Sequence, residues 1–343
     1  MKLGAEKIKR IAVFRALQLG DMLCSIPALR ALHHAYPNAH ITLLGLPWGQ
    51  SLIARFPHYI HSFKHFPGYP GLPEQKLNVS DFTWFLRDVQ QEQFDLVLQM
   101  QGNGSIVNSM VELFGAKYTA GFYLKDDYRP NEDLFLEYPA GVHEVERHLQ
   151  LMTFLGIESC GTSLEFPLYK KDCEEYTQLR LPVQPQQYVC IHPGSRGAWR
   201  QWPAKYFAKL ANYCAEQGFQ IVLTGTKDEQ TIIQQVAKEA KTETVIAAGK
   251  TSLGAVGVLI KNAVLLISNC TGVSHMAAAF ETPSLVISMD GEPERWGPLN
   301  KKLHRTFDWR RHPHFEQVFA ELKHLFGCLQ RNHIGNKMIP VAK

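Results

Sequence analysis

Short apolar runs alternate with longer amphipathic stretches along most of the chain, a pattern typical of parallel strands joined by crossover helices. The apolar runs predict strands at residues 10–14, 41–44, 95–99, 118–122, 188–191, 220–223, 244–247, 263–267 and 284–288. The stretches between them predict helices at residues 22–36, 48–56, 106–114, 143–155, 204–216, 228–240, 253–261, 273–281 and 315–326. The pattern therefore indicates an α/β protein with doubly wound sheets.

The alternation breaks at residues 170–187, which are charged and contain glutamine and proline. We place a domain boundary there and predict one domain over residues 1–175 and another over 186–310. Residues 311–343 are then a C-terminal helix and tail, and packing back onto the first domain is the arrangement we consider for them. The length of 343 residues agrees with two domains of roughly 150 residues.

Composition narrows the class of partner. The chain is 45% hydrophobic and 20% charged, as in a globular protein, and its net charge of +4 suits an anionic ligand but is too small to indicate nucleic acid. Seven cysteines form no C-x-x-C pair, and Cys24, Cys190 and Cys214 lie in apolar runs, which predicts buried thiols in a reducing compartment. With neither a signal sequence nor an apolar run of about eighteen residues, we expect a cytoplasmic protein.

Residues 268–275 are small and polar, and they stand between a predicted buried strand and a small apolar helix. Backbone amides at a helix start attract phosphate, and ligands of open α/β sheets bind beyond the carboxyl ends of the strands. An ordinary turn with a capping Thr or Ser fits these residues equally well.

Three other turns follow strand ends, at Gly20-Asp21, at residues 192–200 and at residues 224–229. Arg200 is a candidate counter-charge for a diphosphate, beside backbone amides at Gly194 and Ser195. Asp228 or Glu229 could accept hydrogen bonds from a ribose diol. Asp21 is an isolated carboxylate at a helix start, a position that the helix dipole alone also favours.

Three further motifs have simpler interpretations. Gly102-Asn103-Gly104 lacks the third glycine of a dinucleotide-binding turn. His143 and His148 lie about 140° apart around a helix, so they cannot share a metal, and we interpret this stretch as a solvated helix face. The basic, aromatic residues 301–315 are interpreted as a solvated loop in preference to a contact with anionic lipid head groups.

Nine short motifs follow one another in a fixed order over nearly the whole chain. They are residues 10–15, 19–23, 27–29, 98–102, 192–195, 200–203, 224–225, 249–253 and 268–275. Together they resemble glycosyltransferase family 9, the ADP-heptose:lipopolysaccharide heptosyltransferases.

The resemblance implies a GT-B fold, in which two Rossmann-like domains face a central cleft. The first domain would bind the acceptor and the second the nucleotide sugar. It further implies an inverting, metal-independent transfer of heptose from ADP-heptose to a lipopolysaccharide-core-type acceptor, with no cofactor. The partners would be a nucleotide-sugar donor and a glycolipid or saccharide acceptor, with peripheral contact at the cytoplasmic face of the inner membrane as a further expectation.

The resemblance also assigns roles to single residues. Asp21 matches the general base, which takes the proton of the acceptor hydroxyl. Residues matching the donor-binding positions are Gly194, Ser195, Arg200, Glu229, Thr251, Thr271, Gly272 and His275.

One position departs from the family. Cys270 stands where relatives usually carry an acidic residue that reaches the donor sugar. Two alternatives therefore stay open: a family member that uses a different nucleotide sugar and glycan acceptor, and a non-catalytic protein that binds nucleotide sugars.

Overall fold

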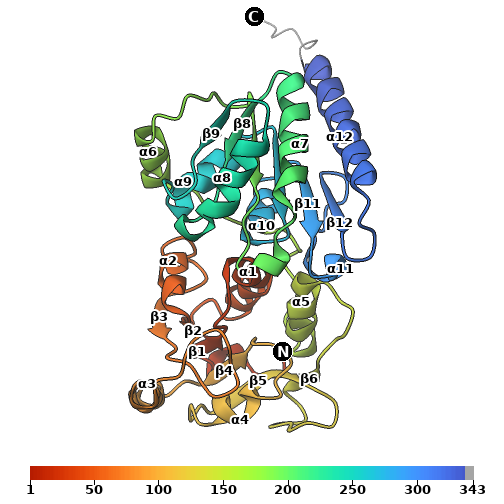
Figure 1. Ribbon diagram of the computed structural model, residues 1–343. Coiled ribbons are helices and arrows are strands. Elements are labelled where there is room, and N and C mark those ends of the chain that lie inside the picture. Colours follow the sequence, from red (N-terminus) through yellow and green to blue (C-terminus); the bar gives the residue numbers. More distant parts are fainter. Residues whose placement is uncertain (337–343) are drawn as a thin grey trace, which may run out of the picture. The chain divides into compact units, whose positions relative to one another are not determined.

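The computed structural model describes the backbone of residues 1–336 and the side chains of residues 1–327. The chain divides into two compact units between Pro167 and Leu168 (Figure 1). This division precedes the predicted boundary stretch, because helix α6 (Lys170–Gln178) packs against α9 (Leu253–Lys261) and so belongs to the second unit.

The first unit is built on a six-stranded parallel sheet with the order β3-β2-β1-β4-β5-β6. Its strands are β1 (Arg10–Phe14), β2 (His40–Gly45), β3 (Ser62–His65), β4 (Leu96–Gln99), β5 (Tyr118–Tyr123) and β6 (Phe135–Glu137). Its helices are α1 (Leu19–Ala35), α2 (Gln50–Ile53), α3 (Val79–Gln91), α4 (Val107–Glu112) and α5 (Glu144–Phe154).

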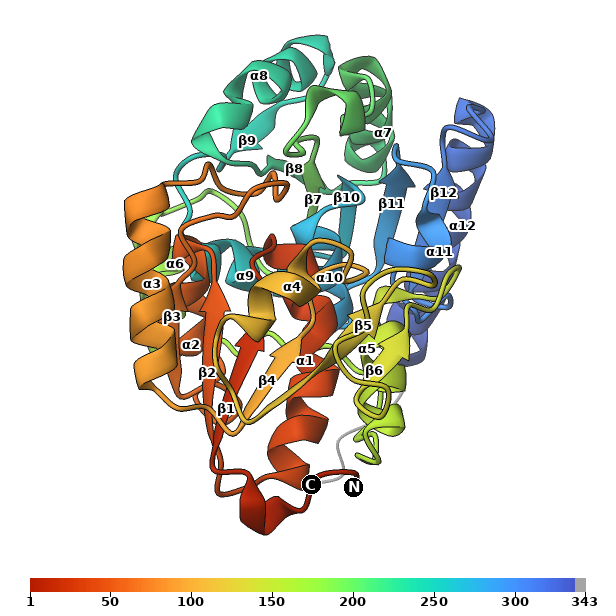
Figure 2. The same cartoon turned by 90° about the horizontal axis from the view of Figure 1, so that it is seen from below.

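Helices cover both faces of this sheet. On one face, Ala12 and Phe14 of β1 pack with buried side chains of α3 and α4 in a core that includes Phe66, Phe85 and Phe114. The alternate residues of β1 point to the opposite face, where α1 and α5 run side by side (Figure 2). Burial on both faces explains why β1 is an uninterrupted apolar run rather than an alternating one.

The second unit repeats this plan with the strand order β12-β11-β10-β7-β8-β9. Its strands are β7 (Tyr188–His192), β8 (Gln220–Leu223), β9 (Thr244–Ile246), β10 (Leu265–Asn269), β11 (Ser284–Ser288) and β12 (His304–Asp308). Besides α6 and α9, its helices are α7 (Ala204–Glu216), α8 (Gln230–Glu239), α10 (Gly272–Ala279), α11 (Pro293–Trp296) and α12 (Phe315–Asn336).

The described apolar side chains of α12 are part of the second unit's core. Val318, Leu322 and Phe326 are buried with residues of α7 and α8, and the Phe326 ring stacks on Phe219 at 5.3 Å. The helix runs beside α7 (Figure 1). This apolar side thus completes the second unit, whereas our sequence analysis considered packing onto the first domain.

The strands missing from the sequence-based prediction, β3, β6 and β12, are all edge strands, and the missing helices are α3, α6 and α11. β3 and β12 are half-exposed edge strands, and their residues form no apolar run. The interpretation of residues 301–315 as a loop is therefore wrong for β12, which pairs with β11. Helix α3 was also missed, although Asn78 is a residue type that favours a helix start. In the structure its side chain caps α3 by accepting from the amides of Ser80 and Asp81.

Candidate functional site

In the second unit, six of the eight predicted donor-binding residues lie on two neighbouring turns. Gly194, Ser195 and Arg200 follow β7, whereas Thr271, Gly272 and His275 follow β10. These two strands pair directly, with His192 opposite Ser268. Because β8 and β11 lie on opposite sides of them, the chain leaves the sheet in opposite directions here. This is the topological switch point, where ligands of open parallel sheets bind.

Asn269, at the end of β10, fixes the turn that follows β7. Its buried side-chain amide donates to the carbonyls of Pro193 (2.7 Å) and Gly194 (3.2 Å), and its Oδ1 accepts from the Trp202 amide (2.9 Å). Asn269 lies within the 268–275 motif, but the sequence assigned it no role. Because all three hydrogen bonds of this buried side chain go to the backbone of another segment, Asn269 holds that segment in place as a structural clamp.

Trp202 anchors the other end of the turn. Its ring is fully buried, with the rings of Phe207 and Trp309 each 5.1 Å away in edge-to-face contact. Arg200 precedes this anchor by two residues, so its backbone is tied to the core.

Arg200 itself is partly exposed and has a defined orientation. Its Nη2 donates to Oδ2 of Asp290 at 2.5 Å and to the Cys270 carbonyl at 3.4 Å. Asp290 follows β11 and also accepts from the Ser288 hydroxyl at 2.7 Å. The Arg200 side chain is 32% exposed, so a guanidinium with an anionic partner also faces solvent. Asp290 was not among the predicted residues, although an acid just beyond a strand end is the signal that singled out Asp21.

Cys270 brings no charge to this turn. The side chain is buried, and burial, followed by the nearby Asp290 carboxylate, raises the pKa of its thiol to about 12. The thiol is therefore neutral at physiological pH. The carboxylate that contacts Arg200 is supplied by Asp290, on the next strand.

The start of α10 presents backbone donors. Thr271 is the extended N-cap residue, and its carbonyl accepts from both the amide (2.9 Å) and the hydroxyl (2.7 Å) of Ser274. Gly272 begins the helix, where the first amides have no acceptor within the helix. His275 is buried one turn further on, with its ring 6.4 Å from that of Trp296.

Glu229 lies against the turn after β7. Its Oε2 accepts from the Thr226 amide at 2.7 Å and lies 3.7 Å from His192 Nε2. A Cβ built on Gly194 would come within 2.1 Å of the Glu229 carboxyl carbon, so any larger residue there would displace the Glu229 side chain. Burial lowers the pKa of His192, and Glu229 opposes that shift.

Thr251 lies apart from the other predicted residues. It follows the edge strand β9 and precedes Ser252, whose hydroxyl caps α9 by accepting from the Ala255 amide at 3.1 Å. Two strands, β8 and β7, separate β9 from β10. Thr251 and the turns after β7 and β10 thus occupy different positions along one edge of the sheet.

Asp21 occupies the equivalent switch point of the first unit. It lies in the first turn of α1, directly after β1, and β1 pairs with β2 on one side and β4 on the other. The loop before Asp21 is tied to the end of β4, because the Ala16 amide donates to Oε1 of Gln101 at 2.8 Å. Burial raises the pKa of the Asp21 carboxyl, the Arg15 charge opposes this, and Glu144 adds to it.

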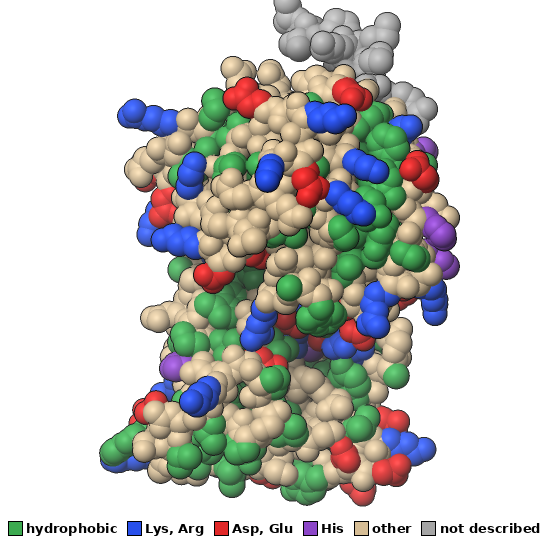
Figure 3. Space-filling view, in the orientation of Figure 1, with side chains coloured by type: hydrophobic (Ala, Val, Ile, Leu, Met, Phe, Trp, Pro, Cys, Tyr) green, Lys and Arg blue, Asp and Glu red, His purple; other side chains and the backbone are tan. Residues whose placement is uncertain are grey.

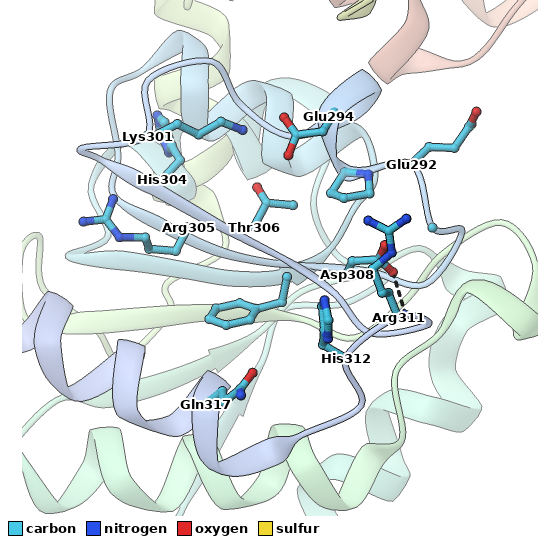
Figure 4. Close-up of a pocket in the computed structure, with 13 residues that line it drawn as sticks. Glu292, Glu294, Lys301, His304, Arg305, Thr306, Asp308, Arg311, His312 and Gln317 are labelled. Carbon is cyan, nitrogen blue, oxygen red and sulfur yellow. Dashed lines mark hydrogen bonds between the residues drawn. The ribbon is translucent and has the colours of Figure 1, made fainter. Parts of the chain in front are cut away.

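A cavity of about 620 Å³ lies elsewhere in the second unit, beside β12. Figure 4 shows that both basic and acidic side chains line it, among them Lys301, Arg311, Glu294 and Asp308. Arg305 is also paired with Glu321 at 2.5 Å. None of the predicted donor-binding residues lines this cavity, so it is separate from the site at the switch point.

Comparison with known proteins decides the family. Residues 83–322 match Glycosyltransferase family 9 (heptosyltransferase), which is more than half of the chain. The chain belongs to this family. As a family member it is a glycosyltransferase.

Individual relatives cover almost the full length. Lipopolysaccharide heptosyltransferase 3 of Escherichia coli is 25% identical over 316 residues, which are 87% of this chain and 89% of the relative. The structure of E. coli ADP-heptose lps heptosyltransferase II matches with a TM-score of 0.74 at 20% identity, covering 95% of this chain and all of the other. An E. coli heptosyltransferase solved with ADP matches with a TM-score of 0.68 at 18% identity, covering 92% and 99%. The expected GT-B fold is confirmed.

The clamp at Asn269 yields a testable prediction. Asn269→Ala leaves the Trp202 amide and two carbonyls without their partner, at a cost of about 1–3 kcal/mol for each buried group that finds no other bond. We expect a lower unfolding midpoint by calorimetry. Asn212→Ala is the matched control, because Asn212 accepts an exposed bond from the Lys241 amide. Equal unfolding midpoints of Asn269→Ala and the unaltered protein would contradict the clamp.

Proposed function

We propose that the protein is an inverting glycosyltransferase that moves a heptose from ADP-heptose to a lipopolysaccharide-core-type acceptor. The observation that carries this proposal is that each sheet has functional side chains at its topological switch point. Anion-binding groups occupy that point in the second unit, and a carboxylate with a raised pKa occupies it in the first. The relatives are named for heptose transfer, which supports the choice of sugar.

The second unit would hold the donor. Arg200 is placed to neutralise a diphosphate, and the first amides of α10 with Thr271 and Gly272 are placed to donate to its oxygens or to the sugar. Gly194 and Ser195 would let the backbone approach the diphosphate closely, and His275, in α10, would contact the phosphates or the sugar. Glu229 would accept from the ribose diol, and Thr251 would lie near the base. A neighbouring structure that contains ADP supports an adenine nucleotide.

The first unit would supply the base. Asp21 would take the proton of the acceptor hydroxyl as that oxygen attacks the anomeric carbon. The bond between the anomeric carbon and the phosphate oxygen breaks, and ADP leaves with the electron pair. One displacement from the opposite side inverts the anomeric centre. We propose that no metal takes part, because Arg200 and helix amides would stabilise the charge on the leaving diphosphate.

The class of acceptor and a contact with the membrane are also proposed. None of the helices within the described residues is long and apolar enough to cross a bilayer. On the face shown in Figure 3, acidic side chains are interspersed with the Lys and Arg side chains. This mixture agrees with the small net charge of +4 and with a saccharide or glycolipid acceptor rather than nucleic acid. We also propose that the protein is located in the cytoplasm and makes peripheral contact with the membrane.

Asp21→Asn tests the base. The amide cannot accept the proton, so we expect transfer to fall by at least about a hundredfold, measured as ADP release. ADP binding should stay unchanged. In the unaltered enzyme, kcat should fall as pH drops through the raised pKa of Asp21, because only the carboxylate accepts a proton. Asp21→Asn should lack this acid limb.

The same raised pKa separates a catalytic loss from a folding loss. A carboxyl whose pKa is higher in the folded state costs folding free energy when it ionises, at any pH above the unfolded value. Asp21→Asn should therefore unfold at the same temperature as the unaltered protein, or higher, at neutral pH. Normal turnover by this variant would remove Asp21 from its role.

Arg200→Gln tests the donor site, with Arg196→Gln as the matched control. Loss of a charge-assisted contact should weaken ADP binding by about 1.5–3 kcal/mol, roughly ten- to a hundredfold. Arg196 is exposed on the same turn, so its replacement should change ADP affinity by less than about threefold. Titration calorimetry measures both. Equal affinities in the two variants would contradict the assignment.

A further inference from the structure

The first turns of α5 contain charged side chains that are buried, not solvated. Glu144, Arg147 and His148 are exposed by only 4%, 2% and 1%. The interpretation of residues 143–148 as a solvated helix face is therefore wrong. In helix α5, charged groups occupy core positions, where they have partners. Burial of several charged groups in one place is costly and needs a reason.

Arg15 connects this cluster to the proposed base. Its Nε and Nη2 both donate to the main-chain carbonyl of Asp21, at 3.0 and 2.8 Å, and its Nη1 donates to the Met100 carbonyl. The guanidinium thus joins the first turn of α1 to the end of β4. Its side chain is fully buried. A planar fork of donors on one carbonyl restricts the orientation of that peptide.

Glu144 holds Arg15 from the α5 side. Its Oε1 lies 3.2 Å from Arg15 Nη2, and its Oε2 is paired with Arg147. Arg147 is in turn held by the carbonyls of Pro139 (3.1 Å) and Val142 (3.0 Å). The carboxylate therefore bridges two arginines, and each arginine is tied to a backbone segment.

His148 completes the surroundings as a neutral group. Its Nε2 lies 3.2 Å from Glu144 Oε1. Burial, and then the Arg15 charge, lowers the pKa of His148 to about 4, so the ring is uncharged near neutral pH. The charged groups that act on Asp21 are accordingly Arg15 from the β1–α1 loop and Glu144 from α5, and Arg147 pairs with Glu144.

We propose that Arg15 and Glu144 are positioning residues for Asp21: Arg15 fixes the main chain of Asp21, and Glu144 fixes Arg15. Neither touches substrate. The proposal rests on the proposed function of Asp21 as the base. It assigns α5, which contributes none of the predicted site residues, the task of setting the geometry and charge around that base.

Three substitutions separate geometry from charge. Arg15→Lys keeps the positive charge but loses the fork, so we expect kcat to fall about tenfold to a hundredfold with the KM for ADP-heptose within about twofold. Glu144→Gln removes the negative charge while its amide oxygen can still accept from Arg15. The acid limb of kcat and the pKa of Asp21 should then both move to lower pH. Arg15→Gln should move both to higher pH.

The readouts are ADP release from ADP-heptose with a heptose-deficient lipopolysaccharide acceptor, and ¹³C NMR titration of the Asp21 carboxyl. The resonance is assigned by its absence in Asp21→Asn. The matched control is Glu165→Gln, because Glu165 pairs with Arg30 on the same helix α1 but nearer its other end. This control should leave kcat and the Asp21 titration unchanged. Thermal unfolding checks that each variant folds.

The outcomes distinguish the two proposals. Normal turnover by Asp21→Asn, or none by the unaltered protein, would overturn the proposed function, while opposite shifts of the Asp21 titration would still support the pairing with Arg15 and Glu144. Conversely, an inactive Asp21→Asn together with full kcat in Arg15→Lys would overturn the positioning role alone. An Asp21 titration that Glu144→Gln leaves in place would overturn the part assigned to Glu144. Shifts in the same direction for Arg15→Gln and Glu144→Gln would indicate a merely structural effect.

Discussion

Parallel pairing of the first strand with the fourth is the constraint on which both candidate sites depend. In each unit the first strand is central, the next two strands extend the sheet on one side, and the fourth starts the other side. The crossover that leaves the first strand and the one that leaves the fourth strand therefore run in opposite directions, and the turns at the carboxyl ends of these two strands lie next to each other. The turns after β7 and β10, and the turn after β1 beside β4, arise from this one topological feature.

A turn at such a point still needs to be held, and in each unit a buried polar side chain bonds to its backbone. Asn269 spends its amide on two carbonyls and one amide of the neighbouring turn. Arg15 spends its guanidinium on the carbonyls of Asp21 and Met100. The uncharged clamp needs no counter-charge, whereas the charged one requires the carboxylate of Glu144. The difference explains why α5 has charged residues inside the core.

Much of the fold could be predicted because burial on both faces makes strands such as β1 and β10 continuous apolar runs. Among the edge strands, β9 was predicted, but β12 is mixed in character and was interpreted as a loop. The resemblance supplied candidate residues for the donor site, and the structure brings six of them onto paired turns. The pairing of side chains from different strands or helices, such as Asp290 with Arg200 and Glu144 with Arg15, could not be found by local pattern. Their contacts span 90 and 129 residues of chain.

Family membership suggests heptose as the donor sugar, but the residues near the expected sugar differ from the family pattern. Cys270 is neutral, and Asp290 carries the negative charge near it. The most direct measurement is ADP release from purified protein given ADP-heptose and a heptose-deficient lipopolysaccharide, with NMR of the product's anomeric centre and parallel reactions with UDP- and GDP-linked sugars. The account predicts one ADP per heptose transferred, inverted configuration, and no comparable turnover with the other donors. Retained configuration, or release of nucleotide only from another donor, would contradict it.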